Sequence, residues 1–148
     1  MRIENSVTVN RPVETVFAAM TDVERTPKWS ATVQREWWKT DPPIRVGSVR
    51  HSEGVILGQP FENDATVSEY DPPHRAVLRG DVGGMPLGIG FTFDPVPGGT
   101  RITVIAEFEP RGALRFAAPM IRNEYRKIWN RDLATFKRMI EAGQLSGS

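Results

Sequence analysis

Apolar and polar residues alternate along the first ten positions of the chain. Between residues 2 and 10 the mainly apolar side carries Ile3, Asn5, Val7 and Val9. A period of two residues predicts a β-strand with one buried face. After Asn10, Pro12 suits the first turn of a helix, because its missing N–H needs no partner there. The next apolar residues recur at the spacing of a short amphipathic helix, namely Val13, Val16, Phe17 and Met20.

A second short helix and six further strands are predicted to follow. Asp22 can cap another helical turn, which Pro27 limits before Trp29. Stretches with strand character, separated by Pro and Gly, then occupy residues 32–40, 48–57, 60–70, 75–82, 87–93 and 100–110. Because the separators are short, neighbouring strands are expected to be hairpin partners in an antiparallel sheet.

The C-terminal part of the chain has the period of a long amphipathic helix. Its apolar stripe consists of Ile121, Tyr125, Ile128, Trp129, Leu133, Phe136 and Ile140. Pro119 is expected to kink this helix or to separate a first segment at residues 112–118. Gly143 is placed to end the helix, and we expect residues 144–148 to fray.

This order of elements predicts an α+β fold in which a curved, seven-stranded antiparallel sheet wraps around the long C-terminal helix. Two short helices follow the first strand. One helix cannot cover so wide a sheet, so either side chains fill the interior or a ligand cavity remains. Glycines in or near the strands favour a cavity, because they permit bending and leave side-chain space empty, at Gly80, Gly83, Gly84, Gly88 and Gly90.

Composition agrees with one globular domain spanning residues 1–148, with an ordered core at about residues 2–142. The net charge of +1 gives no general attraction for nucleic acid or an anionic membrane, so we expect neither nucleic-acid binding nor stable membrane insertion. With no cysteine and only His51 and His74 as histidines, we expect no metal site. The N-terminus lacks the apolar run of a signal peptide, which predicts a cytoplasmic location. The oligomeric state is left open.

Four segments resemble the SRPBCC superfamily, whose START-like helix-grip fold is shared with birch-pollen allergens and lipid-transfer START domains. Residues 9–33, VNRPVETVFAAMTDVERTPKWSATV, are similar to its opening signature. Residues 67–80, 91–112 and 122–141 are similar in order and spacing to its polyketide cyclase/dehydrase branch. The resemblance covers about residues 2–142. It implies the helix-grip fold, and it allows cyclases, dehydratases and binders of lipids or hormones.

Three residues are candidates for acid–base chemistry in the predicted cavity. The alternation in residues 48–57 places His51 and Glu53 on the side of Val49, Val55 and Leu57, which we expect to face inward. An imidazole beside a carboxylate can act as a general base. The alternative is a reversed register, or a polar contact without catalytic role. Tyr125 on the helix stripe can orient a ligand oxygen or belong to the core.

The expected ligand-binding wall is mostly aromatic and aliphatic. It comprises Trp37, Asn63, Leu78, Ile89, Phe91, Ile121, Tyr125 and Trp129. Trp37 is preferred to Trp38 because it shares strand parity with Val33, a choice that also turns Arg35 inward. Arg35 then needs an acidic partner, for which Glu53 and Glu69 are the candidates.

Three functions are consistent with these features. The first is binding of a hydrophobic or amphipathic small molecule, such as a polyketide, lipid or aromatic metabolite, without a cofactor. The second is a polyketide cyclase or dehydratase that moves a proton with His51 and either Glu53 or Tyr125. The third, regulatory or chaperone-like binding of another protein, predicts a filled interior and an extended apolar patch on the surface.

Overall fold

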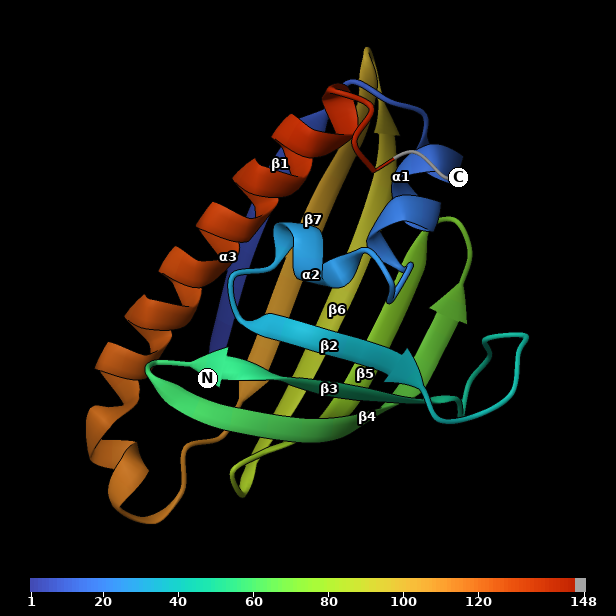
Figure 1. Ribbon diagram of the computed structural model, residues 1–148. Helices are drawn as coiled ribbons and strands as arrows, with labels where there is room; N and C mark the ends of the chain where they lie inside the picture. The colour runs from blue at the N-terminus through green and yellow to red at the C-terminus, as the bar shows by residue number, and fades with distance from the viewer. Residues whose placement is uncertain (146–148) are drawn as a thin grey trace.

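The computed structural model describes residues 1–145, which form a curved sheet with a long helix across its concave side (Figure 1). The first elements are β1 (Arg2–Val9), α1 (Val13–Met20) and α2 (Thr26–Trp29). The remaining strands are β2 (Val33–Trp38), β3 (Val49–Ile56), β4 (Gln59–Asp71), β5 (Arg75–Val82), β6 (Met85–Val96) and β7 (Gly99–Phe108). The 3₁₀ helix η1 (Gly112–Ala117) leads into α3 (Ala118–Glu141). The predicted order of elements is confirmed.

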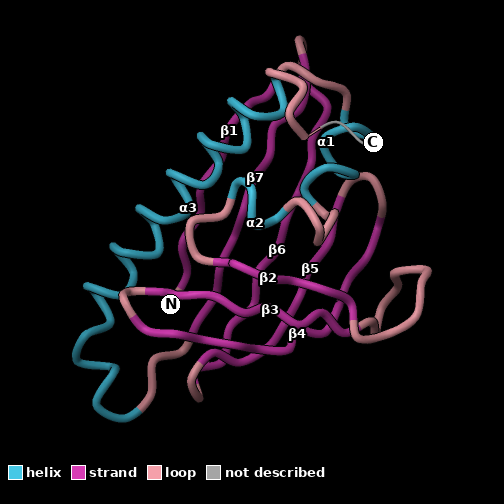
Figure 2. The backbone as a smooth tube through the Cα atoms, viewed as in Figure 1, coloured by secondary structure: helices cyan, strands magenta, loops and turns pink. Residues whose placement is uncertain are grey.

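All neighbouring strands are antiparallel, in the order β1-β7-β6-β5-β4-β3-β2. Successive strands from β2 to β7 are therefore hairpin neighbours, and β1 returns to pair with β7. Figure 2 shows β2, β3 and β4 crossing in front of β5, β6 and β7, so the sheet bends around the space beside α3. At the β5–β6 turn, Gly83 and Gly84 have φ angles of 60° and 83°, which glycine adopts readily.

The helix α3 is fixed to β1 by polar contacts as well as by its apolar stripe. Asn5 Nδ2 donates hydrogen bonds to Asn130 Oδ1 at 2.5 Å and to the carbonyl oxygen of Arg126 at 3.3 Å. Further along the helix, Lys137 Nζ donates to the carbonyl oxygen of Thr8 at 2.7 Å. These bonds set the position of α3 along the strand, and thereby which of its side chains reach the interior.

Both ends of α3 follow the sequence signals. Pro119 lies in the first turn, so the segment before it forms the separate helix η1. Gly143 has a φ angle of 75° just beyond the last turn. The expected fraying is wrong for Leu145, which is 1% exposed and packs into the core. The same expectation for residues 146–148 lies outside the described residues.

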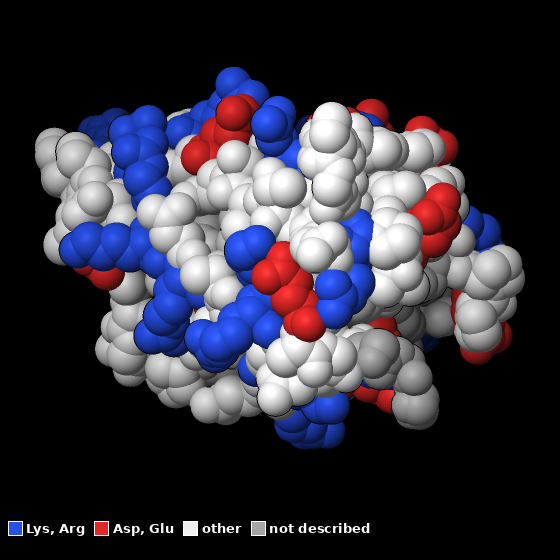
Figure 3. All heavy atoms as spheres, turned by 90° about the horizontal axis from the view of Figure 1, so that it is seen from above, with Lys and Arg blue, Asp and Glu red and all other residues white. Residues whose placement is uncertain are grey.

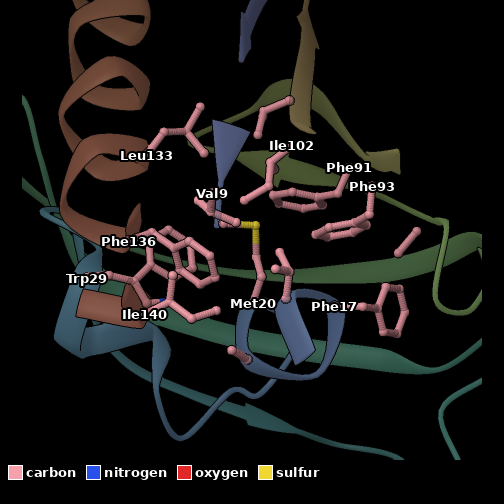
Figure 4. Close-up of a cluster of buried hydrophobic side chains, with 14 of the residues drawn as sticks. Val9, Phe17, Met20, Trp29, Phe91, Phe93, Ile102, Leu133, Phe136 and Ile140 are labelled. Atoms are coloured by element: carbon pink, nitrogen blue, oxygen red, sulfur yellow. The ribbon is translucent and has the colours of Figure 1, made fainter. Parts of the chain in front are cut away.

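The main core lies between the sheet, α1, α2 and the C-terminal half of α3. Figure 4 shows Met20 and Phe17 of α1, Phe91 and Phe93 of β6, and Phe136 of α3 gathered in this cluster. The rings of Phe17 and Phe93 meet edge to face with centroids 5.2 Å apart. A second cluster, which includes Ile121, Tyr125 and Phe108, fills the other end of the helix interface. The space left between these clusters is the cavity described below.

A β-bulge in β2 decides which side chains of this strand face inward. The pairing with β3 shifts between Val33 and Arg35, so that Val33 pairs with Gly54 and Arg35 pairs with Glu53. An extra residue in one strand reverses the alternation that follows it. Consequently Val33 and Glu36 both line the interior, whereas Trp37 is on the outer face.

The helix α3 carries six Lys and Arg residues: Arg122, Arg126, Lys127, Arg131, Lys137 and Arg138. Figure 3 shows Lys and Arg side chains gathered on one side of the surface in that view. Acidic neighbours on the same helix balance part of this charge, since Lys127 lies 3.6 Å from Glu124 and Lys137 lies 2.9 Å from Glu141. This agrees with an ordinary solvated helix face. Within residues 1–145, none of the helices combines the length and apolar character needed to cross a membrane.

Candidate ligand-binding cavity

A cavity of about 110 Å³ lies between the sheet and α3. Its wall is mainly apolar, with contributions from α1, α2, the strands β2–β6 and α3. Glycine helps to shape it. A Cβ atom on Gly80 of β5 would come within 2.5 Å of the carbonyl oxygen of Asp64, so β5 approaches β4 closely only because residue 80 has no side chain.

Aromatic rings form the part of the wall nearest the middle of α3. The ring centroids of Trp29 and Trp129 are 6.4 Å apart, and those of Trp129 and Phe91 are 5.9 Å apart. Trp29 also packs edge to face on Phe136, which connects the wall to the main core. Such flat, rigid surfaces suit contact with a planar or branched apolar ligand.

Glu36 is the centre of a polar group in the cavity wall. Its side chain is only 2% exposed, and its two carboxylate oxygens accept hydrogen bonds of 2.7 Å from Thr26 Oγ1 and Ser52 Oγ. Arg50 Nε lies 3.3 Å from Glu36 Oε2. This contact is an ion pair rather than a directed hydrogen bond, since Arg50 Nε is buried and has no hydrogen-bond partner among the described residues. Arg50 therefore retains donor capacity close to the cavity.

Asp132 brings a second carboxyl group to the wall from α3. Its residue exposure is 2%, and Oδ1 accepts a hydrogen bond of 2.9 Å from the backbone N–H of Ala31. Burial raises the pKa of Asp132 to about 6, although the Ala31 hydrogen bond and the charge of Arg131 act in the opposite direction. This carboxyl group can therefore exchange a proton close to neutral pH.

Tyr125 adds a phenol to the wall one helical turn from Trp129. Its ring packs against Phe108 with centroids 5.1 Å apart, and burial raises the pKa of its hydroxyl group. Among residues 1–145, the Tyr125 hydroxyl has no hydrogen-bond partner. The neutral hydroxyl is thus available to a ligand oxygen.

The structure brings together most of the residues expected to bind a ligand. Six of them line the cavity: Asn63, Leu78, Ile89, Phe91, Tyr125 and Trp129. Ile121 does not line it, because about one turn before Tyr125 on α3 it packs with Ile3 and Phe108 in the second core cluster.

The expectation that His51 and Glu53 share the cavity wall is wrong. On β3 the cavity is lined by Arg50, Ser52 and Ile56, whereas His51 lies on the outer face with its ring centroid 4.6 Å from that of Trp37. The hydrogen bond from His51 to Asp64 raises the pKa of the imidazole. The aliphatic residues used to choose the inward side of β3 lie at its two ends, where Val55 and Leu57 are exposed.

The expected inward position of Trp37 and Arg35 is wrong for a different reason. The bulge at Val33–Arg35 reverses the parity on which it rested. Arg35 does pair with Glu53, at 3.3 Å, but on the outer face. Glu69 follows a similar bulge in β4 and pairs with Arg75 at the surface.

The sequence prediction missed the polar residues Glu36, Arg50, Ser52 and Asp132. Asp132 had a recognisable signal, because it follows Tyr125 by seven residues and Trp129 by three and so falls on the apolar stripe of α3. A carboxylate in such a stripe points to a functional or paired position. Glu36 and Arg50 had no equivalent signal, since their inward direction depends on the bulge and on the register of β3.

The curved sheet, the helix across it and the cavity between them define a helix-grip, ligand-binding fold. A family model described as "Polyketide cyclase / dehydrase and lipid transport" matches residues 1–141. The chain belongs to this family, which confirms the resemblance found in its sequence. A comparison with curated proteins gave no match.

Solved structures show the same architecture at low sequence identity. The Zhui aromatase/cyclase from Streptomyces sp. R1128 is 14% identical, with a TM-score of 0.81 and coverage of 97% of each chain. TTHA0849 from Thermus thermophilus is 13% identical, with a TM-score of 0.80 and coverage of 97% of this chain and 99% of that one. A protein from Chromobacterium violaceum, CV1439, is 19% identical, with a TM-score of 0.70 over 95% of this chain and 97% of that one. These likenesses concern the fold.

Proposed function

We propose that this protein binds a hydrophobic or amphipathic small molecule that carries at least one hydrogen-bonding oxygen, as an aromatic metabolite, a polyketide or a lipid does. The observation that carries the proposal is the combination of an aromatic and aliphatic wall with polar groups, three of which are charged groups or an unpartnered hydroxyl. These three are the Glu36–Arg50 pair, Asp132 and the Tyr125 hydroxyl. A mostly apolar pocket with few polar groups is how proteins orient such ligands.

The cavity is small, so it must enlarge to hold a ligand of drug size. A volume of about 110 Å³ accommodates a small group, whereas pockets for drug-sized ligands measure about 300 Å³ or more. The half-buried lining residues Ile56, Val82 and Leu87 lie beside the β3–β4 and β5–β6 turns. We expect this end of the wall to move outward when a larger ligand binds.

A fluorescent apolar probe tests the proposal. The probe should bind the native protein saturably and raise its melting temperature by mass action. Leu78→Trp fills the cavity and should weaken binding by about tenfold or more, by direct exclusion. Thr66→Trp, on the exposed face of the adjacent strand, adds the same side chain outside the cavity and should leave probe affinity unchanged. Equal binding by both variants would place the probe elsewhere and contradict the proposal.

A second candidate function is proton transfer to or from the bound molecule, as in a polyketide cyclase or dehydratase. The specific observation in its favour is Asp132, because burial raises its pKa to about 6 inside the same cavity. General acid–base groups work best when their pKa lies near the operating pH. Tyr125 and Arg50 line the same cavity, where their donor groups could stabilise a carbonyl oxygen during such a step.

Asp132→Asn separates this enzymatic function from binding alone. With a ligand that the protein converts, turnover should fall about 10²-fold or more, whereas ligand affinity should change little. His51→Gln is the matched control, because His51 lies outside the cavity and should not affect turnover. Turnover that survives Asp132→Asn but is lost in His51→Gln would exclude Asp132 as the acid–base residue.

A further inference from the structure

A compact group of ionisable side chains lies on the outer face of the sheet, away from the cavity. His51 Nδ1 is 2.6 Å from Asp64 Oδ1, and His51 Nε2 is 3.2 Å from Glu53 Oε2 and 3.8 Å from Glu62 Oε2. The imidazole is mostly covered, with a side-chain exposure of 15%, while Glu62 is 72% exposed. The central imidazole is therefore held in place by its neighbours, and the group is open to solvent on the side of Glu62.

The strand register places like charges opposite each other in this group. Glu53 of β3 pairs directly with Glu62 of β4, and His51 pairs directly with Asp64. Two carboxylates at directly opposed positions of an antiparallel pair are destabilising. A cation between Glu53 and Glu62 removes this repulsion, and the nitrogen His51 Nε2 faces the same space.

The basic neighbours leave the inner oxygens of the group accessible. Arg35 contacts Oε1 of Glu53 at 3.3 Å, which leaves Oε2 facing the imidazole. Lys39 contacts Oδ2 of Asp64 at 2.8 Å, which leaves Oδ1 to accept the Nδ1 proton. No Lys or Arg of the described residues forms an ion pair with Glu62.

We propose that His51, Glu53 and Glu62 form a surface binding site for a divalent transition-metal ion of the Zn²⁺ type. A tetrahedral Zn²⁺ ion about 2.0–2.1 Å from its nitrogen and oxygen ligands requires these atoms to be roughly 3.3–3.4 Å apart. The Nε2 distances of 3.2 and 3.8 Å come close to this requirement, and all three ligand atoms lie within 4.8 Å of one another. Water supplies the fourth ligand from the exposed side.

Asp64 completes the site as a positioning residue. Nε2 contacts Glu53 Oε2 in the metal-free protein, and a metal ion takes the place of any proton there, while Asp64 keeps the Nδ1 proton and orients the Nε2 lone pair toward the metal. An imidazole nitrogen with carboxylate oxygens suits Zn²⁺, Ni²⁺ or Cu²⁺ better than Mg²⁺ or Ca²⁺, which prefer oxygen ligands alone. From the sequence we expected no metal site, because the chain has no cysteine and only two histidines, His51 and His74. The strand pairing instead brings one histidine and two glutamates together.

Isothermal titration of the tag-free protein with Zn²⁺ at neutral pH tests this site. The wild-type protein should bind one Zn²⁺ ion, and Mg²⁺ should not compete. His51→Gln and Glu62→Gln should each weaken Zn²⁺ binding by about tenfold or more, because each removes one ligand. Asp64→Asn should also weaken Zn²⁺ binding by about tenfold, because the imidazole of His51 loses the carboxylate that orients it. His74→Gln removes the other histidine and should leave the affinity unchanged.

Trp37 provides a local second readout, because its ring is 4.6 Å from that of His51. Cu²⁺ bound at the site should quench Trp37 fluorescence, and the Cu²⁺-dependent loss of fluorescence should largely disappear in Trp37→Phe.

Absence of one-to-one Zn²⁺ binding by the wild-type protein would overturn the proposal. Unchanged Zn²⁺ affinity in both His51→Gln and Glu62→Gln would do so as well. Leu78→Trp should not alter metal binding, so the result is independent of the cavity.

Discussion

Glu36 and Asp132 both carry buried carboxyl groups, but the two groups have different numbers of hydrogen-bond and ion-pair partners. Glu36 receives two hydroxyl hydrogen bonds and lies beside Arg50, whereas Asp132 receives only one backbone hydrogen bond in its burial. Burial with so few partners favours the protonated form of Asp132, whose pKa is raised to about 6. Asp132 could be suspected from its place on the helix stripe, but Glu36 could not, because no local pattern reveals the three partners that surround it.

Asp132 should make the free energy of unfolding depend on pH. Its pKa is raised from 3.8 to about 6 in the folded protein, so the folded state binds more protons between these values. The contribution of Asp132 to the free energy of unfolding is fully present below about pH 4. It falls by at most about 3 kcal/mol as the pH rises through about 6. Asp132→Asn should therefore match the wild type near pH 4 and be more stable near pH 8 in denaturant unfolding. An equal loss of stability at both pH values would contradict this prediction.

Glu36→Ala should destabilise the protein by about 2–4 kcal/mol, because it leaves Thr26, Ser52 and Arg50 without their buried partner. Glu69→Ala is the control, since it breaks a surface ion pair with Arg75 and should cost less than about 1 kcal/mol. Urea unfolding of both variants measures the difference. Similar costs for the two changes would show that Glu36 is not held as described.

At the scale of secondary structure, regular periodicity predicted the elements well and irregular positions limited the prediction. The alternation in β1 and the stripe on α3 correctly marked Ile3, Val9 and Phe136 as buried. The bulge in β2 inserts one residue and reverses the alternation, so Trp37 was placed on the wrong face. A bulge depends on pairing with another strand, which a local pattern does not contain.

The docking of α3 can be measured at Phe136, which is 0% exposed and contacts the ring of Trp29. Phe136→Ala should cost about 3–5 kcal/mol in denaturant unfolding, because it removes a fully buried ring. Phe116→Ala deletes the same atoms at a position that is 81% exposed, and should change stability by less than about 0.5 kcal/mol. A cost below about 1 kcal/mol for Phe136→Ala would mean that α3 is not docked on the sheet in this way.

For the whole molecule, the decisive feature is that one helix covers a sheet too wide for it. Phe91 and Trp129 close one part of the interior, but glycine at position 80 and small residues such as Ala65 leave space in the wall. The order of elements predicted this fold and favoured a cavity, and the family match agrees with both. The Glu36–Arg50 group of the cavity was not predictable, because it is assembled from α2, β2 and β3 by long-range packing.

Native mass spectrometry of the protein after incubation with a cell extract tests the central claim most directly. The wild-type protein should retain a small molecule with apolar character and at least one oxygen, in a one-to-one complex. Leu78→Trp should retain much less of it, and Thr66→Trp should retain as much as the wild type. If the wild-type protein retains no small molecule, or if Leu78→Trp retains it equally, the cavity between the sheet and α3 is not a ligand site.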